Sequence, residues 1–247
     1  AIDYSDAEVG GGGAGAWLRL QRSIADRLVF AKIRDRVGGN IRFFVSGSAP
    51  LAPVIMKFFY AAGMPILEGY GLTETSPVVS VNTFEHLKFG TVGRPIVNVD
   101  VRIEPDPERP DGDGEILVRG PNVMQGYYHL PEKTAEVLSE DGWFRTGDVG
   151  ILDSDGFLAI TDRKKDLIKT SGGKYVAPQP IENEIKTSRY VSQAVVVGNK
   201  RKYASVLIVP NFDNLLAWAR QQGLATEDRD ALLENEAVPK LYAEALV

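Results

Sequence analysis

The stretch IRFFVSGSAPLAPVIMKFFYAAGMPILEGYG, residues 41–71, decides the fold class. It opens with a short apolar run, Ile41–Gly47, continues with apolar residues at helical spacing as far as Gly63, and closes with a second apolar run, MPILEGYG. These patterns predict a strand, a helix and a second strand, the unit of a parallel sheet. Ligands of such sheets bind at the carboxyl ends of the strands, where the segments SGSAP and GYGLTET lie.

The residues before this unit predict a connector followed by a helix. The opening AIDYSDAEVGGGGAGAW has the spacing G-x-G-x-x-G within residues 10–15, but no strand precedes it. We therefore interpret it as a flexible connector and not as a dinucleotide site. From Trp17 to Val37 apolar residues recur at helical spacing, and a Gly-Gly-Asn sequence then predicts the end of a helix.

From about Thr91 the pattern changes to short alternating strands. The sequences VNVDVRIEP, PDGDGEILVRG and GWFRTGDVGILDSDGFLAITD carry Asp-Gly turn signals at residues 111–114, 141–142 and 155–156. They predict antiparallel hairpins that form a small barrel or sheet packed on the α/β part. A charged, glycine-bearing segment follows and ends as a helix. After it we expect two strands around a basic turn and two amphipathic helices.

Composition excludes several classes of function. The net charge of −5 over 247 residues offers no broad basic surface for a nucleic acid. No apolar stretch reaches the roughly 20 residues that span a bilayer, and no leader sequence is recognisable, so we expect a cytoplasmic protein or one peripheral to a membrane. With no cysteine, and only His86 and His129, thiolate zinc sites and a cysteine nucleophile are excluded. Thiol chemistry would have to use a thiol from another molecule.

The run Tyr70–Thr75, after the second predicted strand, combines groups suited to a nucleotide and a divalent cation. Mg²⁺ takes one or two protein carboxylates, and Glu74 fits that role. Thr73 and Thr75 can donate hydroxyl hydrogen bonds to phosphate or to an acyl carboxylate oxygen, Gly71 permits close backbone approach, and Tyr70 offers an aromatic face to a purine. An ordinary strand exit with threonine and glutamate facing water explains the same residues, so both interpretations stay open here.

Several longer motifs bear on that choice. The sequences GYGLTETSP, GEILVRGPNVMQGYY, GWFRTGDVG and DRKKDLIKTSGGKYVAPQPIE occur in this order along the chain. In order and spacing the chain resembles, from about Gly39 to its end, the adenylate-forming enzymes: acyl-CoA synthetases, luciferases and peptide-synthetase adenylation domains. The form DLIKTSGGKYVAPQPIE is similar to that of long-chain fatty acid CoA ligases, whereas peptide-synthetase domains usually carry Gln-Val-Lys after the glycines.

The resemblance implies a nucleotide site. Thr73 would contact the α-phosphate and Glu74 the Mg²⁺. Asp148 would hold both ribose hydroxyls, because a carboxylate can accept two hydrogen bonds from a vicinal diol, and Arg163 would also reach the ribose. An aspartate that merely closes a Gly-Asp turn is the alternative for Asp148. The remaining nucleotide-binding residues implied in this way are Ser46, Gly47, Ser48, Ala49, Pro50, Glu68, Gly69, Tyr70 and Gly71.

For the second half-reaction the resemblance implies a rotation of the small domain. Lys165 matches the hinge position, and a few such residues absorb the backbone change in hinge motions. Lys169, as a catalytic residue, and Gly172 with Gly173, as part of the coenzyme A tunnel, would then reach the active site. A solvated charged linker is the alternative interpretation of the RKKD sequence.

The fold and domains expected on these grounds are α/β with α+β. Residues 1–40 form a connector and helix, and residues 41–162 the carboxyl-terminal part of a large AMP-binding domain, with its parallel-sheet piece and small antiparallel barrel or sheet. Residues 163–247 form an incomplete, smaller, mobile α+β domain. The boundary is placed at Asp162–Lys165.

The reaction implied is that of a carboxylate with ATP to give an acyl-adenylate and pyrophosphate, followed by attack of the coenzyme A thiol with release of AMP. Fatty acid, ATP and coenzyme A would be the substrates and Mg²⁺ the metal. An enzyme that adenylates aryl or amino acids, and a non-catalytic AMP-binding module, are the alternatives.

Two family parts are not found: the Ser/Thr/Gly-rich phosphate loop and the carboxyl-terminal catalytic lysine. We therefore expect a carboxyl-terminal fragment of a longer ligase that does not turn over alone. A first sheet without its neighbours predicts exposed apolar area and self-association, which leaves a homodimer and peripheral membrane association open.

Overall fold

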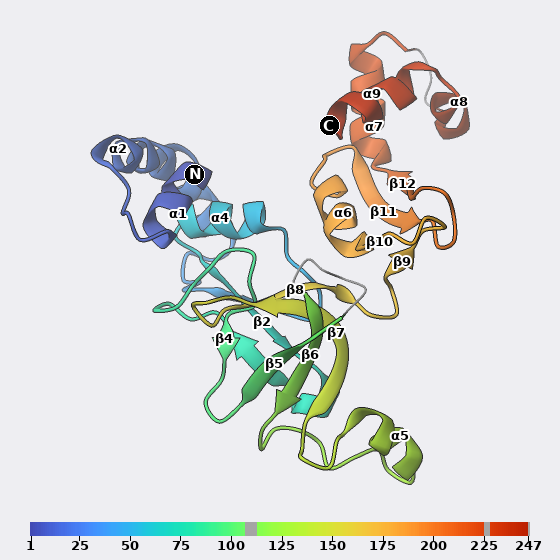
Figure 1. The fold of residues 1–247 in the computed structure, drawn as a ribbon. Helices are drawn as coiled ribbons and strands as arrows, with labels where there is room; N and C mark the ends of the chain where they lie inside the picture. Colours follow the sequence, from blue (N-terminus) through green and yellow to red (C-terminus); the bar gives the residue numbers. More distant parts are fainter. Residues whose placement is uncertain (107–112, 225–227, 247) are drawn as a thin grey trace. The chain divides into compact units, whose positions relative to one another are not determined.

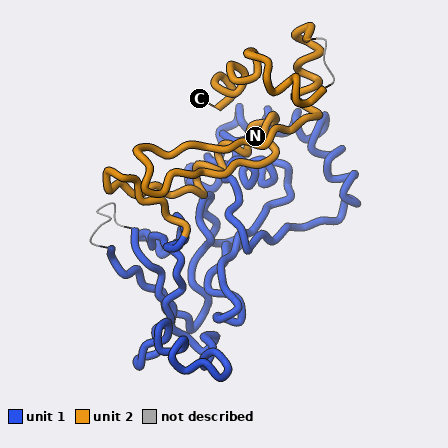
Figure 2. The backbone as a smooth tube through the Cα atoms, turned by 90° about the vertical axis from the view of Figure 1, so that its right-hand side faces the viewer, with its two compact units in different colours: residues 1–165 blue, residues 166–247 orange. Residues whose placement is uncertain are grey.

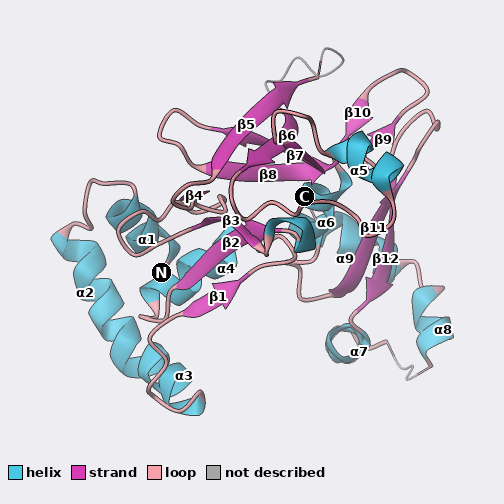
Figure 3. Ribbon diagram, turned by 90° about the horizontal axis from the view of Figure 1, so that it is seen from below, coloured by secondary structure: helices cyan, strands magenta, loops and turns pink. Residues whose placement is uncertain are grey.

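The structure is a computed structural model that describes residues 1–106, 113–224 and 228–246. The chain divides into two compact units, residues 1–165 and residues 166–247 (Figure 2). Both units contain helices and strands, which gives the mixed α/β and α+β architecture expected from the sequence (Figure 3). Within the described residues, no helix combines the length and the apolar character that crossing a membrane requires.

Unit 1 begins with helices. Their bounds are Ile2–Val9 for α1, Ala16–Ala25 for α2, Asp26–Phe30 for the π-helical turn η1 and Ala31–Arg36 for α3. The helix predicted from Trp17 to Val37 is confirmed, with the π-turn in its middle. The connector expected at the start is wrong for α1, which lies beside α4, Pro53–Ala61 (Figure 1). There the fully buried Ser5 donates a 2.6 Å hydrogen bond to the carbonyl of Lys57. The glycine run that suggested a connector begins only after this helix.

The first sheet has the strand order β1-β2-β3-β4. The strands span Phe44–Ser46, Ile66–Gly71, Val78–Val81 and Arg94–Pro95. β1 and β2 are parallel and α4 connects them, which confirms the predicted strand, helix and strand. β1 is shorter than predicted, because residues 41–43 are outside the ladder. The buried side chains of Phe30, Ala61 and Met64 form a core cluster among α4, the helices before it and β1, against which Phe44 packs.

The second sheet of unit 1 is antiparallel, with the order β5-β6-β7-β8. Its strands span Asp100–Pro105, Gly114–Arg119, Phe144–Leu152 and Leu158–Arg163, and α5, Pro131–Val137, lies between β6 and β7 in the chain. Of the two predicted forms, barrel and sheet, the described strands show the sheet. Gly156, with φ +81°, makes the predicted turn between β7 and β8. Residues 111–112 of another predicted turn lie outside the described residues.

Unit 2 contains two short hairpins and four helices within its described residues. Their bounds are Ile168–Lys169 (β9), Tyr175–Val176 (β10), Pro178–Ile185 (α6), Val191–Val197 (β11), Ser205–Pro210 (β12), Phe212–Gln221 (α7), Arg229–Leu233 (α8) and Ala237–Ala245 (α9). The two strands around a basic turn are confirmed as β11 and β12. The expected pair of terminal helices is wrong, because the described residues after β12 contain three. Asp228 caps α8, and Asn235 accepts a hydrogen bond from Ala237 N–H at the start of α9.

Candidate functional site

Three residues from three separate motifs meet at the junction of the two sheets of unit 1. The Tyr70 hydroxyl, at the end of β2, donates a 2.7 Å hydrogen bond to Asp148 Oδ2 of β7. Arg163 Nε, at the end of β8, donates a 2.9 Å hydrogen bond to Asp148 Oδ1. Each carboxylate oxygen therefore has one protein donor and keeps lone pairs for another. Asp148 is only 4% exposed.

Burial keeps the phenol of Tyr70 protonated. Burial of the phenol, with the negative charge of Asp148 beside it, raises the pKa of Tyr70 well above its ordinary value. Tyr70 is therefore a neutral hydrogen-bond donor at physiological pH, while Arg163 supplies the positive charge opposite Asp148. The ring of Tyr70 packs against the buried core cluster that includes Val79 and Ile116, which fixes its direction.

A bulge in β7 places Asp148 in this position. Ile116 of β6 alone lies opposite Thr146–Asp148, so β7 has extra residues there. Gly147 has φ +73°, a conformation that favours glycine. The Thr146 hydroxyl donates to the carbonyl of Ile116 at 2.8 Å and accepts from the N–H of Asp148 at 3.1 Å. The sequence RTGD thus forms a bulge that the Thr146 hydroxyl braces, and Asp148 follows it as the register partner of Arg163 in β8.

The segment Ser46–Pro50 adjoins Glu68 of β2. Ser46 and Glu68 are register partners in the parallel pair of β1 and β2, and the N–H of Leu51 donates to Glu68 Oε1 at 3.1 Å. Ser48 has φ +67°, in the left-handed region, which non-glycine residues enter infrequently. Burial raises the pKa of Glu68 to about 7, and the hydrogen bond from Leu51 opposes this shift. The residues Gly47, Ser48, Ala49 and Pro50 are exposed.

Glu74 lies just beyond β2, in the 3₁₀ turn η2 that spans Thr73–Thr75. One of its carboxylate oxygens, Oε1, accepts a 2.9 Å hydrogen bond from the hydroxyl of Tyr127. Burial and that hydrogen bond raise the pKa of Tyr127, so it stays a donor. Glu74 is partly exposed and Thr73 is exposed, so both can meet a ligand. A carboxylate that keeps lone pairs after one neutral donor suits a hard cation such as Mg²⁺.

Two residues of the run have structural partners that the sequence did not reveal. The hydroxyl of Thr75, fully buried, donates to the carbonyls of Leu72 and Pro77 and accepts from the N–H of Leu72. Its predicted role as a phosphate donor is therefore wrong in this structure. Gly71 is required by packing, because a Cβ there would lie 1.6 Å from the carbonyl oxygen of Pro77.

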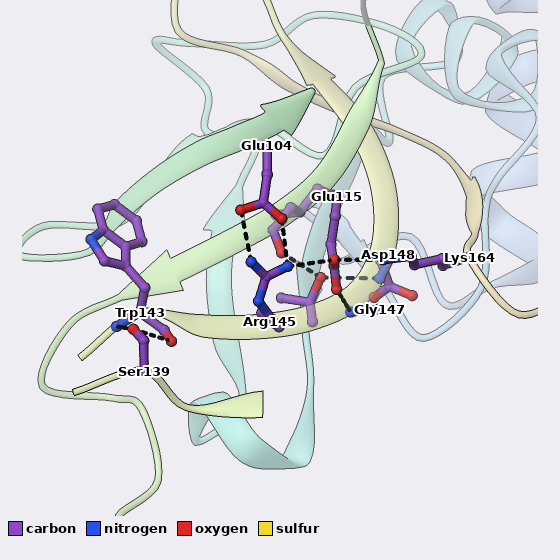
Figure 4. A network of polar contacts seen from close by, with 10 residues as sticks. Glu104, Glu115, Ser139, Trp143, Arg145, Gly147, Asp148 and Lys164 are labelled. Carbon is purple, nitrogen blue, oxygen red and sulfur yellow. Dashed lines mark hydrogen bonds and ion pairs between the residues drawn. The ribbon is translucent and has the colours of Figure 1, made fainter. Parts of the chain in front are cut away.

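Four charged side chains form a network beside the bulge (Figure 4). Arg145 Nη2 donates to Glu104 at 2.7 Å, and Arg145 Nη1 donates to Glu115 at 3.1 Å. Lys164 Nζ donates to the same Glu115 oxygen at 3.0 Å, and the N–H of Gly147 donates to the other at 3.2 Å. The hydrogen bond from Arg145 lowers the pKa of Glu104. No sequence pattern predicts this network, since its members come from β5, β6, β7 and the residue after β8.

The predicted residues of the thiol step belong to unit 2, after Lys165, which is exposed and ends unit 1. Lys169 Nζ lies 4.7 Å from the ring centroid of Tyr175 and donates to its hydroxyl at 3.0 Å. The glycine turn connects β9 and β10, and Gly173 has φ +80° and donates its N–H to the carbonyl of Thr170 at 2.9 Å. Gly172 has no atom within 4 Å of an added Cβ, so open space surrounds it.

The motifs therefore predicted part of the site, but not the residues that hydrogen-bond to the predicted ones and hold them in place. Tyr127 stands in the motif GEILVRGPNVMQGYY but received no role there. Four strands, β3 to β6, lie in the chain between Glu74 and Tyr127, so no periodic signal indicates the contact between the two. Glu115 and Arg145 also stand inside predicted motifs, and only the strand register of the sheet brings them together.

Comparison with known proteins identifies the class. Residues 16–128 match the family described as AMP-binding enzyme, and residues 165–229 match the AMP-binding enzyme C-terminal domain. The chain belongs to the AMP-binding enzyme family.

Particular relatives are similar at about 40% identity. The long-chain-fatty-acid–CoA ligase FadD15 of Mycobacterium tuberculosis is 42% identical over 97% of this chain and 40% of its own length. The peroxisomal long chain acyl-CoA synthetase 6 of Arabidopsis thaliana is 40% identical over 87% of this chain and 32% of its own length. The chain thus spans well under half the length of these relatives.

A solved structure shares the fold. It is the O-succinylbenzoate coenzyme A synthetase of Bacillus subtilis in complex with ATP and a magnesium ion, which is 30% identical with a TM-score of 0.63. The match covers 74% of this chain and 40% of that chain.

Proposed function

We propose that this chain is part of an acid–thiol ligase that activates a long-chain fatty acid with ATP and transfers the acyl group to coenzyme A. The observation that carries the proposal is the hydrogen-bonded cluster of Tyr70, Asp148 and Arg163. It joins the three motifs in which the nucleotide residues were expected. The names of the two relatives support the long-chain acid as the substrate.

The nucleotide half of the site is proposed for unit 1. Asp148 receives the ribose hydroxyls on the lone pairs that Tyr70 and Arg163 leave, and it is already fixed before the nucleotide binds. Preorganised acceptors of this kind need no reorganisation during the reaction. The adenine lies against Glu68–Gly71 and the Ser46–Pro50 segment.

The reacting phosphate is proposed to lie near η2. There the exposed hydroxyl of Thr73 can donate to the α-phosphate, and Glu74 can hold Mg²⁺ with Tyr127 orienting its carboxylate. A bound Mg²⁺ would disperse the negative charge of the phosphates. The fatty acid carboxylate attacks the α-phosphorus, and the bond to pyrophosphate breaks. This step depends on alignment and on charge stabilisation more than on proton transfer.

The thiol half is proposed for unit 2. In the second step the sulfur of coenzyme A attacks the acyl carbonyl carbon, the thiol proton leaves to solvent, and the bond from the acyl carbon to AMP breaks. Lys165 is the proposed hinge between units, and Lys169 with the turn at Gly172 and Gly173 takes part after the rotation. Open space around the added Cβ of Gly172 leaves room for a narrow chain to approach the backbone.

The protein is proposed to act in the cytoplasm or at the surface of a membrane, as a longer chain. Phe43 and Val45 at the edge of the first sheet are 41% and 70% exposed, which fits a face that further sequence or a second copy covers. Because the phosphate loop and the terminal lysine were not found, we expect residues 1–247 alone to be inactive.

The proposed function is tested by ATP–pyrophosphate exchange on the complete protein, with residues 1–247 as the comparison. Medium and long fatty acids, aryl acids and amino acids are supplied in turn. We expect exchange with long fatty acids only, and none with the shorter chain. Exchange with amino or aryl acids would replace the substrate class, and no exchange with any acid would favour a binding module.

Two variants test the roles of single residues. Glu74→Ala should abolish Mg²⁺-dependent exchange, whereas Glu132→Ala, an exposed acid in the first turn of α5, should not. Lys165→Pro should preserve exchange and block thioester formation, because proline fixes the backbone at the hinge. Equal loss of both half-reactions in Lys165→Pro would contradict the hinge assignment.

A further inference from the structure

Glu115 is the centre of the charged network of Figure 4, although no motif assigns it a role. Its side chain is 9% exposed and lies on β6, directly opposite Glu104 of β5. Two carboxylates opposite each other on neighbouring strands repel, and such pairs destabilise a sheet unless cations offset them. Arg145 bridges the two, and Lys164 forms a further ion pair with Glu115.

The contacts of Glu115 differ in kind from those of Glu104. Glu104 accepts hydrogen bonds from one guanidinium, that of Arg145. Glu115 holds three separate groups: the guanidinium of Arg145, the ammonium of Lys164 and the backbone N–H of Gly147. The last contact matters most, because Gly147 lies in the bulge of β7, where the regular ladder is interrupted. The carboxylate of Glu115 therefore replaces a missing strand partner.

The groups that Glu115 holds flank the ion pair of the nucleotide site. Gly147 comes immediately before Asp148, and Lys164 comes immediately after Arg163. A backbone hydrogen bond of 2.9 Å from the N–H of Lys164 to the carbonyl of Gly147 ties the same two residues together. The buried carboxylate of Glu115 thus contacts the residue before Asp148 and the residue after Arg163. The second of these, Lys164, directly precedes Lys165.

We infer that Glu115 is a positioning residue: it holds the bulge and the end of β8 so that Asp148 and Arg163 keep the geometry that binds the ribose. The inference rests on the proposed function for the ribose role of Asp148. Glu115 would also fix the residue that precedes the proposed hinge. Lys164 is held to unit 1 by its side chain and its backbone, whereas Lys165 is exposed.

The test compares Glu115→Gln with Glu104→Gln in the complete protein. The two changes are chemically identical, occur on register partners and both weaken the tie to Arg145. Only Glu115→Gln removes the charge that holds Lys164 and weakens the hydrogen bond from the N–H of Gly147, because a neutral amide oxygen is a poorer acceptor than a carboxylate. The readout is the ratio of kcat/KM for ATP to kcat/KM for 2′-deoxy-ATP in pyrophosphate exchange, which measures the contact between Asp148 and one ribose hydroxyl.

We expect the parent protein and Glu104→Gln to favour ATP by about tenfold or more, the usual effect of one hydrogen bond to a charged group. In Glu115→Gln this preference should fall by about tenfold, because the acceptor is no longer aligned. A residue with only a structural role would lower both rates together and leave the ratio unchanged. An unchanged ratio in Glu115→Gln would overturn the inference.

A second readout does not depend on activity. Hydrogen exchange of the Gly147 and Lys164 amides should be at least tenfold faster in Glu115→Gln than in Glu104→Gln. If the parent protein shows no pyrophosphate exchange, the proposed function fails, while this result still decides whether Glu115 holds the two segments. Should Glu115→Gln fail to fold, Lys164→Met replaces it. We expect faster hydrogen exchange at the backbone amide of position 164 in that variant. A rate equal to that of the parent protein would overturn the inference.

Discussion

Removal of one oxygen atom, in Tyr70→Phe, tests how strongly the nucleotide cluster is held. The ring packs against the buried core of unit 1, and phenylalanine keeps that packing. The hydroxyl donates a 2.7 Å hydrogen bond to Asp148, whose side chain is 6% exposed, so water cannot readily replace it. Hydrogen bonds to charged groups contribute about 1.5–3 kcal/mol, and we expect Tyr70→Phe to lower the free energy of unfolding of unit 1 by that amount. Arg163 remains as the second donor, which keeps the loss below that of an unpaired buried charge.

The assay is urea denaturation followed by the fluorescence of one tryptophan. The chain has three tryptophans, of which Trp143 is 8% exposed in unit 1, Trp17 is 68% exposed and Trp218 lies in α7 of unit 2. In a background with Trp17→Phe and Trp218→Phe, the signal of Trp143 reports the unfolding of unit 1 alone. Separate observation of the unit is needed because a chain of two units need not unfold in one step.

A matched control is Tyr128→Phe, since Tyr128 is 86% exposed. Its effect should stay within about 0.5 kcal/mol. Asp148→Asn and the double variant complete a cycle, and we expect a coupling of about 1–2 kcal/mol between Tyr70 and Asp148. Equal effects of Tyr70→Phe and Tyr128→Phe, or a coupling near zero, would refute the reasoning.

Two further predictions concern packing and pH. Gly71→Ala should destabilise unit 1 by about 2–4 kcal/mol in the same assay, because its Cβ would meet the Pro77 carbonyl, whereas Gly172→Ala, with open space around it, should change thermal unfolding little. The second concerns Glu68, whose folded-state pKa of about 7 exceeds the ordinary 4.5. The folded state then binds the proton more tightly, so stability is complete below pH 4.5 and falls by about 3 kcal/mol as pH rises through 7. Glu68→Gln should remove this fall. In urea titrations we expect the variant to be as stable as the parent protein at pH 4 and more stable at pH 8. Stability that changes with pH in the same way in both proteins would contradict the burial argument.

Local signals predicted the elements better than the contacts between them. The strand, helix and strand of residues 41–71 were predicted because apolar spacing and glycine stops act within a few residues. The same approach missed α1, where the neighbouring glycines dominated the interpretation. It also predicted two terminal helices where the described residues contain three, and the hydrogen bond from the N–H of Ala237 to Asn235 Oδ1 at the start of α9 depends on a single side chain.

The candidate site divides in the same way. Asp148 and Arg163 were singled out through their motifs, and the structure joins them by a hydrogen bond. Whether they bind a ribose stays a prediction. Thr75 looked like Thr73 in the sequence, but its hydroxyl is used by the turn itself, and only three-dimensional geometry separates the two. A side chain's partners depend on strand register, which spacing along one chain does not reveal.

The register also explains why residues so far apart in sequence should be treated as one unit. Glu115, Arg145 and Lys164 stand on or next to three neighbouring strands, and Glu115 pairs with both cations, while Glu104 pairs with Arg145 as well. Loss of Glu115 removes the carboxylate that pairs with Lys164 and leaves Arg145 paired with Glu104, whereas loss of Lys164 alone leaves Arg145 to neutralise Glu115. The effects of these substitutions should therefore not add, and removal of Lys164 should cost less in a protein that already lacks Glu115 than in the parent. The motifs GEI, RTGD and DRKK thus contribute residues to one network. The carboxylate of Glu115 lies at its centre, and we infer that this carboxylate holds the Asp148–Arg163 pair in position.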